Sequence, residues 1–321
     1  MPMSAEVRYS LIIPVYKNEA TIRPLLAALE EISTALGAGS FEAVFVIDGS
    51  PDLSYQVLKL HLPNAPFRSL LVCLSRNFGS FSAIRMGLEV AKGQYFAVMA
   101  ADLQEPPELI VKFFVALSQE PVDITIGVRE MRNDPLASAF AANLFWWLYR
   151  RLVQREVSPG GADVFGCNRA VRDALLKIQE ANSTLIGLVY WLGFRRREIP
   201  YVRQARAAGK SAWTLTGKVR YLLDSIFAFT DLPITILIVM GLVGIAGSLI
   251  AGVVIFIAWL SGVITVRGYT PLALLLLTSF SVMVLGLGIV GSYVWRAFEN
   301  TKHRPLYVPM LQEAFDGTDP P

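Results

Sequence analysis

Asp102 and Gln104 are the residues whose types and spacing most directly indicate chemistry. They stand two positions apart in the segment DLQEPPE at 102–108, and side chains at this spacing on an extended segment point to the same side. Carboxylate and amide oxygens suit Mg²⁺ or Mn²⁺, and one or two protein carboxylates are enough for Mg²⁺ when substrate phosphates complete its shell. We therefore predict that Asp102 and Gln104 bind a divalent metal. Capping of the following helix is the alternative role for Asp102.

Three further segments supply groups that could complete such a site. Asp48 in DGS could accept hydrogen bonds from a ribose or base, although Asp-Gly is also an ordinary turn sequence. Asp163 follows a glycine pair that could turn it into the same cleft. Arg203, Arg206 and Lys210 suit a lipid phosphate, or a general attraction to anionic lipid. Neither GxGxxG nor GxxxxGK[ST] occurs, so dinucleotide oxidoreductases and P-loop enzymes lose their main support.

The elements that must position these groups alternate between strand and helix. We expect strands at 9–16, 41–48, 68–75, 94–102 and 122–129, and helices at 19–36, 52–62, 80–92 and 107–119. This alternation predicts a mainly parallel sheet covered by helices. Ligands bind beyond the carboxyl ends of such strands. The segments that follow the first four strands are polar and include PVYKNE, DGSPD, SRNFG and DLQEPPE.

The second half of the chain contains two long apolar runs that are typical of membrane proteins. No charged residue occurs at 234–260 or 272–295, and each run exceeds the roughly 20 residues that span a bilayer. We expect two transmembrane helices, preceded by an amphipathic helix at 215–231 that lies at the membrane surface. A second amphipathic stretch at 136–153 suits the same surface or the face of the sheet.

The distribution of basic residues predicts on which side of the membrane each part of the chain lies. Basic residues flank both spans, whereas the loop between them contains only Arg267, so the large N-terminal domain and both termini are expected in the cytoplasm. The predicted order is an α/β domain at 1–212, a juxtamembrane helix at 213–231, two spans at 232–298 and a cytoplasmic tail at 299–321. The net charge of +3 is small and concentrated near the spans, which favours lipid over nucleic acid as a partner.

Several other protein classes are disfavoured. Cys73 and Cys167 have no CxxC spacing, so neither a disulfide framework nor a zinc site is expected. Neither span contains an ionisable residue that would mark a transport pathway. A processive polysaccharide synthase is disfavoured because two spans are few for enclosing a polymer and no QxxRW segment occurs. Glycines in both spans are compatible with a homo-oligomer.

Six segments together resemble one enzyme family. They are IPVYKNE at 13–19, FVIDGS at 45–50, LSRNFG at 74–79, ADLQEPPELI at 101–110, GGADVFGCNR at 160–169 and IPYVRQARAAGKS from 199. Their order and spacing resemble the polyprenyl-phosphate glycosyltransferases of the GT-A type, which include dolichyl-phosphate mannose synthase and the bactoprenol glucosyltransferases. The resemblance implies a GT-A, Rossmann-like domain. It also implies a hexosyltransferase that moves a sugar from a UDP- or GDP-linked donor to a polyprenyl phosphate, with inversion, at the cytoplasmic membrane face.

The resemblance also implies roles for individual residues. Metal binding falls to Asp102 and Gln104. Asp163 faces the reacting centre, Arg203 and Arg206 grip the acceptor phosphate, and Arg76 lines the cleft. The residues expected to bind the nucleotide donor are Pro14, Tyr16, Glu19, Asp48, Asn77, Lys210 and Ser211.

Three positions depart from the family pattern. Ala100 stands where members commonly have a first acid, Ile47 where they commonly have a second acid before the GS, and Ala212 where they often have lysine. We still expect activity, because Asp102 and Gln104 are the more direct ligands in the family pattern. The alternative is a catalytically degenerate relative that serves as a membrane binding or assembly partner. The lipid is expected to be undecaprenyl phosphate in the inner membrane of a bacterium and dolichyl phosphate otherwise.

Overall fold

The computed structural model describes most of the chain. It covers residues 6–37, 39–129, 150–151, 162–180, 183–204, 223–230, 232–261 and 268–317. The helix expected at 136–153 therefore lies outside the described residues except for 150–151, and of the helix expected at 215–231 the structure describes Leu223–Phe229.

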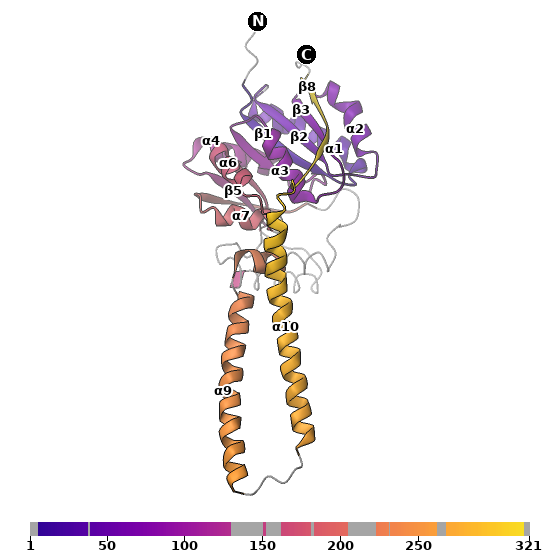
Figure 1. Cartoon of the computed structure of the whole chain (residues 1–321). Coiled ribbons are helices and arrows are strands. Elements are labelled where there is room, and N and C mark those ends of the chain that lie inside the picture. The colour runs from indigo at the N-terminus through magenta and orange to yellow at the C-terminus, as the bar shows by residue number, and fades with distance from the viewer. Residues whose placement is uncertain are drawn as a thin grey trace.

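A single mainly parallel sheet forms the centre of the N-terminal domain (Figure 1). The strands run in the order β7-β5-β6-β4-β1-β2-β3-β8, and β6 and β8 are antiparallel to their neighbours. Strand β2 is buried along its whole length, as expected for a strand covered on both faces. The bounds are β1 Tyr9–Val15, β2 Phe41–Ile47, β3 Arg68–Leu74, β4 Tyr95–Val98, β5 Ile124–Arg129, β6 Ala162–Asn168, β7 Arg196–Tyr201 and β8 Pro309–Phe315.

Helices cover both faces of this sheet. The helices of the domain are η1 Glu19–Thr21, α1 Ile22–Leu36, α2 Ser54–His61, η2 Leu62–Asn64, α3 Ser80–Val90, α4 Pro107–Gln119, α6 Arg169–Lys177 and α7 Leu185–Trp191. The side chains of α1, α2 and α4 share one apolar core, and those of α3, α6 and α7 share the other. The expected α/β architecture is confirmed, and its first five strands and four helices lie within a few residues of their predicted places.

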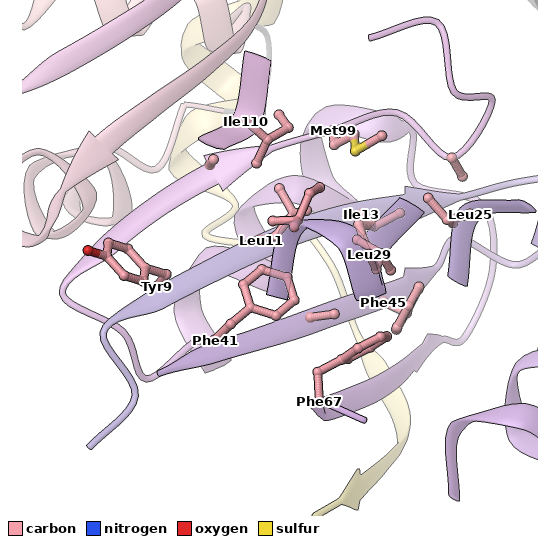
Figure 2. Packing of buried hydrophobic residues seen from close by; sticks show 14 of the residues in the cluster. Tyr9, Leu11, Ile13, Leu25, Leu29, Phe41, Phe45, Phe67, Met99 and Ile110 are labelled. Atoms are coloured by element: carbon pink, nitrogen blue, oxygen red, sulfur yellow. The ribbon is translucent and has the colours of Figure 1, made fainter. Parts of the chain in front are cut away.

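Strand alternation explains why two cores form. Leu11 and Ile13 of β1 enter the first core, whereas Ile12 between them enters the second. In the first core, Leu11 and Ile13 lie among Leu25 and Leu29 of α1 (Figure 2). Each such side chain is fully buried and contributes about 1.5–3 kcal/mol to folding. The sheet is therefore a rigid platform for the loops at its ends.

Two long helices extend away from the sheet domain (Figure 1). They are α9 Leu232–Leu260 and α10 Tyr269–Thr301. Among the described residues, Val282–Thr301 is long and apolar enough to cross a membrane. A second candidate exists only if the short helix Leu223–Phe229 and Leu232–Gly244, which meet at 81°, count as one broken span. The structure thus supplies one candidate span where the sequence predicted two.

The chain then returns to the sheet. Strand β8 pairs with β3, with Ser69 opposite Phe315 and Leu74 opposite Pro309. The sequence predicted that this segment belongs to a separate cytoplasmic tail at 299–321. The structure corrects that interpretation, because residues 309–315 form an edge strand of the catalytic sheet (Figure 1).

Candidate active site

The candidate site lies where four parallel strands end. The loops after β1, β2, β3 and β4 cover residues 16–21, 48–53, 75–79 and 99–106. Parallel strands bring their carboxyl ends to one edge of the sheet, so these loops are neighbours in space. Hydrogen bonds between the loops then fix their relative positions.

Asp48 joins the loop after β2 to the loop after β3. Asp48 is 2% exposed. Its Oδ1 accepts a hydrogen bond from the backbone N–H of Phe78 (2.7 Å), and its Oδ2 accepts one from the backbone N–H of Gly79 (2.9 Å). Burial raises the pKa of Asp48 despite these bonds and the nearby Arg76 cation, which act to lower it. The carboxylate that was expected to contact a nucleotide therefore binds loop amides in this conformation.

Gly49 allows the same two loops to touch. Its φ is +58°, and a Cβ at this position would lie 2.4 Å from the backbone C of Arg76 and N of Asn77. Only glycine tolerates both the conformation and the contact. Arg76 and Asn77 are exposed at this point, and the Arg76 guanidinium lies 3.9 Å from the centre of the Phe78 ring. The two predicted cleft residues are thus presented outward from a fixed backbone.

Glu19 joins the loop after β1 to the start of α2. Its Oε2 accepts a hydrogen bond from the N–H of Leu53 (3.2 Å), and its own N–H donates to Oδ2 of Asp52 (3.1 Å). Lys17 has a φ of +58° and donates its N–H to Oγ of Ser50 (2.7 Å). Left-handed backbone is uncommon outside glycine and stores strain at this loop.

Asp52 is a positioning residue that the sequence analysis missed. Its Oδ1 accepts hydrogen bonds from the Ser50 hydroxyl (2.6 Å) and the Ser54 N–H (3.3 Å). Burial acts to raise the pKa of Asp52, but hydrogen bonds from Ser50, Ser54 and Glu19 outweigh it and hold the pKa below its usual range. The signal was present in SPDLS at 50–54, because serine and aspartate at this spacing favour local side-chain-to-backbone bonds.

The loop that contains Asp102 is held from both sides. Leu103 has a φ of +57°, and Oδ1 of the half-buried Asp102 accepts from the N–H of Gln104 (3.4 Å). The Thr21 hydroxyl donates to the carbonyl of Ala101 (2.8 Å). Glu105, which the sequence analysis did not single out, is 3% exposed and accepts at Oε2 from the N–H of Ala100 (3.2 Å).

Arg203 reaches this loop from beyond the end of β7. Its Nη2 donates to Oε1 of Gln104, and the N–H of Gln204 donates to the carbonyl of Gln104 (3.0 Å). The predicted phosphate-gripping cation and the predicted metal ligand are therefore in direct contact.

The donor set suits a cation that shares its shell with a phosphate. Among the described residues, no group of three or more His, Cys, Asp or Glu side chains could hold a metal ion by itself. Asp102 and Gln104 offer one carboxylate and one amide oxygen, which are hard oxygen ligands. These residues fit Mg²⁺ or Mn²⁺ when a bound diphosphate supplies the other oxygens.

The structure describes some of the remaining predicted site residues and not others. Pro14 of β1 pairs with Val46 of β2, and Tyr16, at the start of the loop after β1, is 36% exposed. Asp163 stands near the start of β6; because Ala97 pairs with Gly166, the backbone of Asp163 lies beyond the carboxyl end of β4, at the same edge as Asp102. The side chain of Asp163 and the whole of Arg206, Lys210 and Ser211 lie outside the described residues.

This edge of the sheet is also the end nearest α10. Helix α10 ends at Thr301, and β8 begins at Pro309 opposite Leu74, the last residue of β3. The N–H of Ser75 donates to the carbonyl of Val308 (2.9 Å). The site loops therefore lie on the side of the domain from which the long helices extend (Figure 1).

Comparison with known proteins gives consistent results. The family described as "Glycosyl transferase family 2" matches residues 10–178. The uncharacterized glycosyltransferase YkcC of Bacillus subtilis is 30% identical over 95% of this chain and 94% of its own. The bactoprenol glucosyl transferase of Shigella phage SfV is 28% identical over 94% and 98%, and the undecaprenyl-phosphate 4-deoxy-4-formamido-L-arabinose transferase of Salmonella paratyphi B is 26% identical over 94% and 92%.

Solved structures match more distantly. The mannosyltransferase PcManGT from Pyrobaculum calidifontis, in complex with GDP-Man and Mn²⁺, has a TM-score of 0.48 at 18% identity and covers 71% of this chain and 65% of that chain. Staphylococcus aureus TarS 1-349 in complex with UDP has a TM-score of 0.43 at 16% identity, over 60% and 58%. This chain spans less than two thirds of the length of either solved chain.

Proposed function

The chain belongs to glycosyltransferase family 2, and on that premise we propose that it transfers a hexose from a nucleotide-linked donor to a membrane polyprenyl phosphate. The donor is UDP- or GDP-linked, and the configuration at the anomeric carbon is inverted. The two relatives named as bactoprenol and undecaprenyl-phosphate transferases support the acceptor, because each match covers more than nine tenths of both chains.

The position of the site relative to α10 carries the proposal. A polyprenyl phosphate keeps its phosphate at headgroup depth, so the enzyme must present its site at the membrane surface. The loops after β1 to β4 lie at the end of the sheet where Ser75 contacts the segment that follows α10. We propose that α9 and α10 both span the membrane and that the catalytic domain and both termini lie in the cytoplasm, where nucleotide sugars are made.

The donor would lie across the first three loops. Tyr16 and Glu19 stand on the loop after β1, and the exposed Asn77 stands on the loop that Asp48 fixes. Pro14 shapes the end of β1, and Lys210 and Ser211 are proposed to bind the donor. Asp102 and Gln104 would hold Mg²⁺ or Mn²⁺, which when bound supplies charge stabilisation for the departing diphosphate.

The acceptor phosphate supplies its own nucleophile. A phosphate monoester has a second pKa of about 6, so its oxygen is already anionic at neutral pH and no strong base is needed. That oxygen forms a bond to the anomeric carbon while the bond from this carbon to the diphosphate oxygen breaks, and the nucleoside diphosphate leaves. Arg203 and Arg206 would hold the acceptor phosphate, and Arg76 would stabilise charge in the cleft. Asp163 would orient the reactants rather than remove a proton.

A donor panel tests the proposal. The full chain in detergent is incubated with radiolabelled UDP- and GDP-hexoses, short-chain polyprenyl phosphate and Mn²⁺ or Mg²⁺, with and without EDTA. We expect one donor to give a lipid-linked product that EDTA abolishes. A folded, lipid-bound protein that gives no product with any donor would favour the non-catalytic membrane partner instead.

A further inference from the structure

The junction between α10 and β8 is an ordered turn. The N–H of Lys302 donates to the carbonyl of Glu299 (3.3 Å), and the Lys302 ammonium pairs with the Glu299 carboxylate. His303 has a φ of +48°, a left-handed conformation that is uncommon outside glycine. Residues 302–308 therefore connect helix to strand through a fixed geometry.

Side chains then fasten the returning segment to the sheet domain. The Tyr307 hydroxyl donates to Oε2 of Glu89 on α3 (2.6 Å), and Glu313 on β8 accepts from Lys59 (2.8 Å) and Tyr55 (3.0 Å) on α2. These contacts add to the backbone pairing of β8 with β3. Beyond the strand, a Cβ on Gly317 would lie 2.5 Å from the backbone of Phe67, so the chain stays pressed against the domain.

This segment also contacts a site loop through its backbone. Val308 accepts the hydrogen bond from Ser75, which directly precedes the exposed Arg76. The segment thus connects the end of α10 to the loop that Asp48 holds from its other side. A movement of α10 relative to the sheet would therefore act on α3 through Tyr307 and on this loop through Val308.

We propose that residues 302–317, here called the strap, fix the height and tilt of the active site above the membrane. This inference rests on the proposed function, because only a membrane-confined acceptor requires a fixed height. A flexible tether would let the domain sample many positions and would lower the fraction in which the lipid phosphate meets the donor. Covering the open edge of β3 is the simpler role for β8, and it predicts no dependence on the turn.

A flexible insertion separates the two roles. About six Gly-Ser residues placed between His303 and Arg304 lengthen the turn but leave β8 free to pair with β3. The matched control has the same residues appended after Pro321. Protection of the Ser75 amide from hydrogen exchange shows that β8 is still paired in both proteins.

The effect of the insertion on the transfer rate is measured with two acceptors. With undecaprenyl phosphate in phospholipid vesicles, we expect the insertion to lower the transfer rate by at least about tenfold relative to the control. With short-chain polyprenyl phosphate in detergent, we expect the two proteins to differ by less than about twofold, since that acceptor is not confined to one depth. Equal rates in vesicles would overturn the proposal.

Spin labels provide a readout that needs no activity. Cys73 and Cys167 are buried and should not react with the label. The labels are attached through the substitutions Leu60→Cys on α2 and Val294→Cys on α10, at positions that are 68% and 63% exposed. We expect a narrow distance distribution in the control and a broad one after insertion. If the unmodified chain transfers no sugar to either acceptor, the proposed function fails. The distance distribution then decides the strap alone, and an unchanged narrow distribution overturns it.

Discussion

Buried carboxylates accept hydrogen bonds from loops at both ends of the sheet, but the surroundings of these carboxylates differ. At the amino end, Oε1 of Glu42 accepts from the Ser10 hydroxyl and the Lys92 N–H, both at 2.6 Å, and the Gly93 N–H donates to Ser10 (2.8 Å). Glu42 is 7% exposed. These hydrogen bonds hold the carboxylate inside the fold, where it joins loops to strands.

A second cluster at the amino end behaves in the same way. Asp123 accepts hydrogen bonds from the Arg195 guanidinium (2.8 and 3.0 Å) and from the Asn168 amide (2.9 Å), which joins the starts of β5 and β7 to the end of β6. The hydrogen bonds from Arg195 lower the pKa of Asp123 from its ordinary value of 3.8. This carboxylate is likewise bound to neighbouring side chains.

The carboxyl end adds strained loop backbone to the same kind of carboxylate–amide contact. Asp48 binds loop amides much as Glu42 does, yet the loops around it present Arg76 and Asn77 outward. The described non-glycine residues with positive φ are Lys17, Leu103 and His303, and all lie at this end or in the strap. Buried carboxylates therefore occur at both ends, and the strained backbone at the carboxyl end supports the proposed site there.

Asp102→Asn should produce the largest difference between the two ends. The isosteric amide keeps an oxygen for the Gln104 N–H but removes the charge that would face a metal–diphosphate pair. Loss of several kcal/mol of charge stabilisation corresponds to about a thousandfold lower transfer. The melting temperature should stay within about 2 °C of the parent protein. Transfer near the parent rate would remove Asp102 from the metal assignment.

Asp48→Asn should have an intermediate effect on both activity and stability. An amide can accept from only one of the Phe78 and Gly79 N–H groups through its oxygen, and it turns its own donor toward the other. We expect a loss of about 1–3 kcal/mol in the free energy of unfolding and roughly tenfold slower transfer, measured by urea denaturation and the donor assay. An effect on donor KM alone, with unchanged stability, would instead indicate direct nucleotide contact.

The pH dependence of this difference has a definite sign. The folded-state pKa of Asp48 is raised above 3.8, so protonation favours the folded state. Its contribution is fully present below pH 3.8 and is lost as the pH rises through the raised value. The stability advantage of the parent protein over Asp48→Asn should therefore shrink as the pH rises through this window.

Glu42→Gln should affect stability without affecting transfer. It weakens the bonds to Ser10 and Lys92 at the amino end, which costs about 1–3 kcal/mol in the free energy of unfolding. Transfer per folded molecule should stay within about twofold of the parent, because no site loop touches Glu42. A selective loss of transfer from fully folded Glu42→Gln would break the division between the two ends.

The first five strands and four helices of the domain were predictable because their apolar periodicity reports local burial. Contacts between the loops were not, since Asp48 to Gly79 and Gln104 to Arg203 depend on how separate strands are arranged. Asp52 and Glu105 were overlooked although their bonds to Ser50, Ser54 and Ala100 are local in the sequence. Strand β8 was missed because PMLQEAF is largely exposed and gains its structure from pairing with β3, more than 200 residues earlier.

The most direct test of the account compares the parent chain, Asp102→Asn and Glu42→Gln side by side. All are placed in vesicles with undecaprenyl phosphate, Mn²⁺ and the donor that the panel identifies, and transfer is expressed per folded molecule. We predict that Asp102→Asn falls to the level seen with EDTA, while Glu42→Gln remains within about twofold of the parent. Equal losses in both variants, or no loss in Asp102→Asn, would contradict the claim that sugar transfer occurs at the carboxyl end of the sheet.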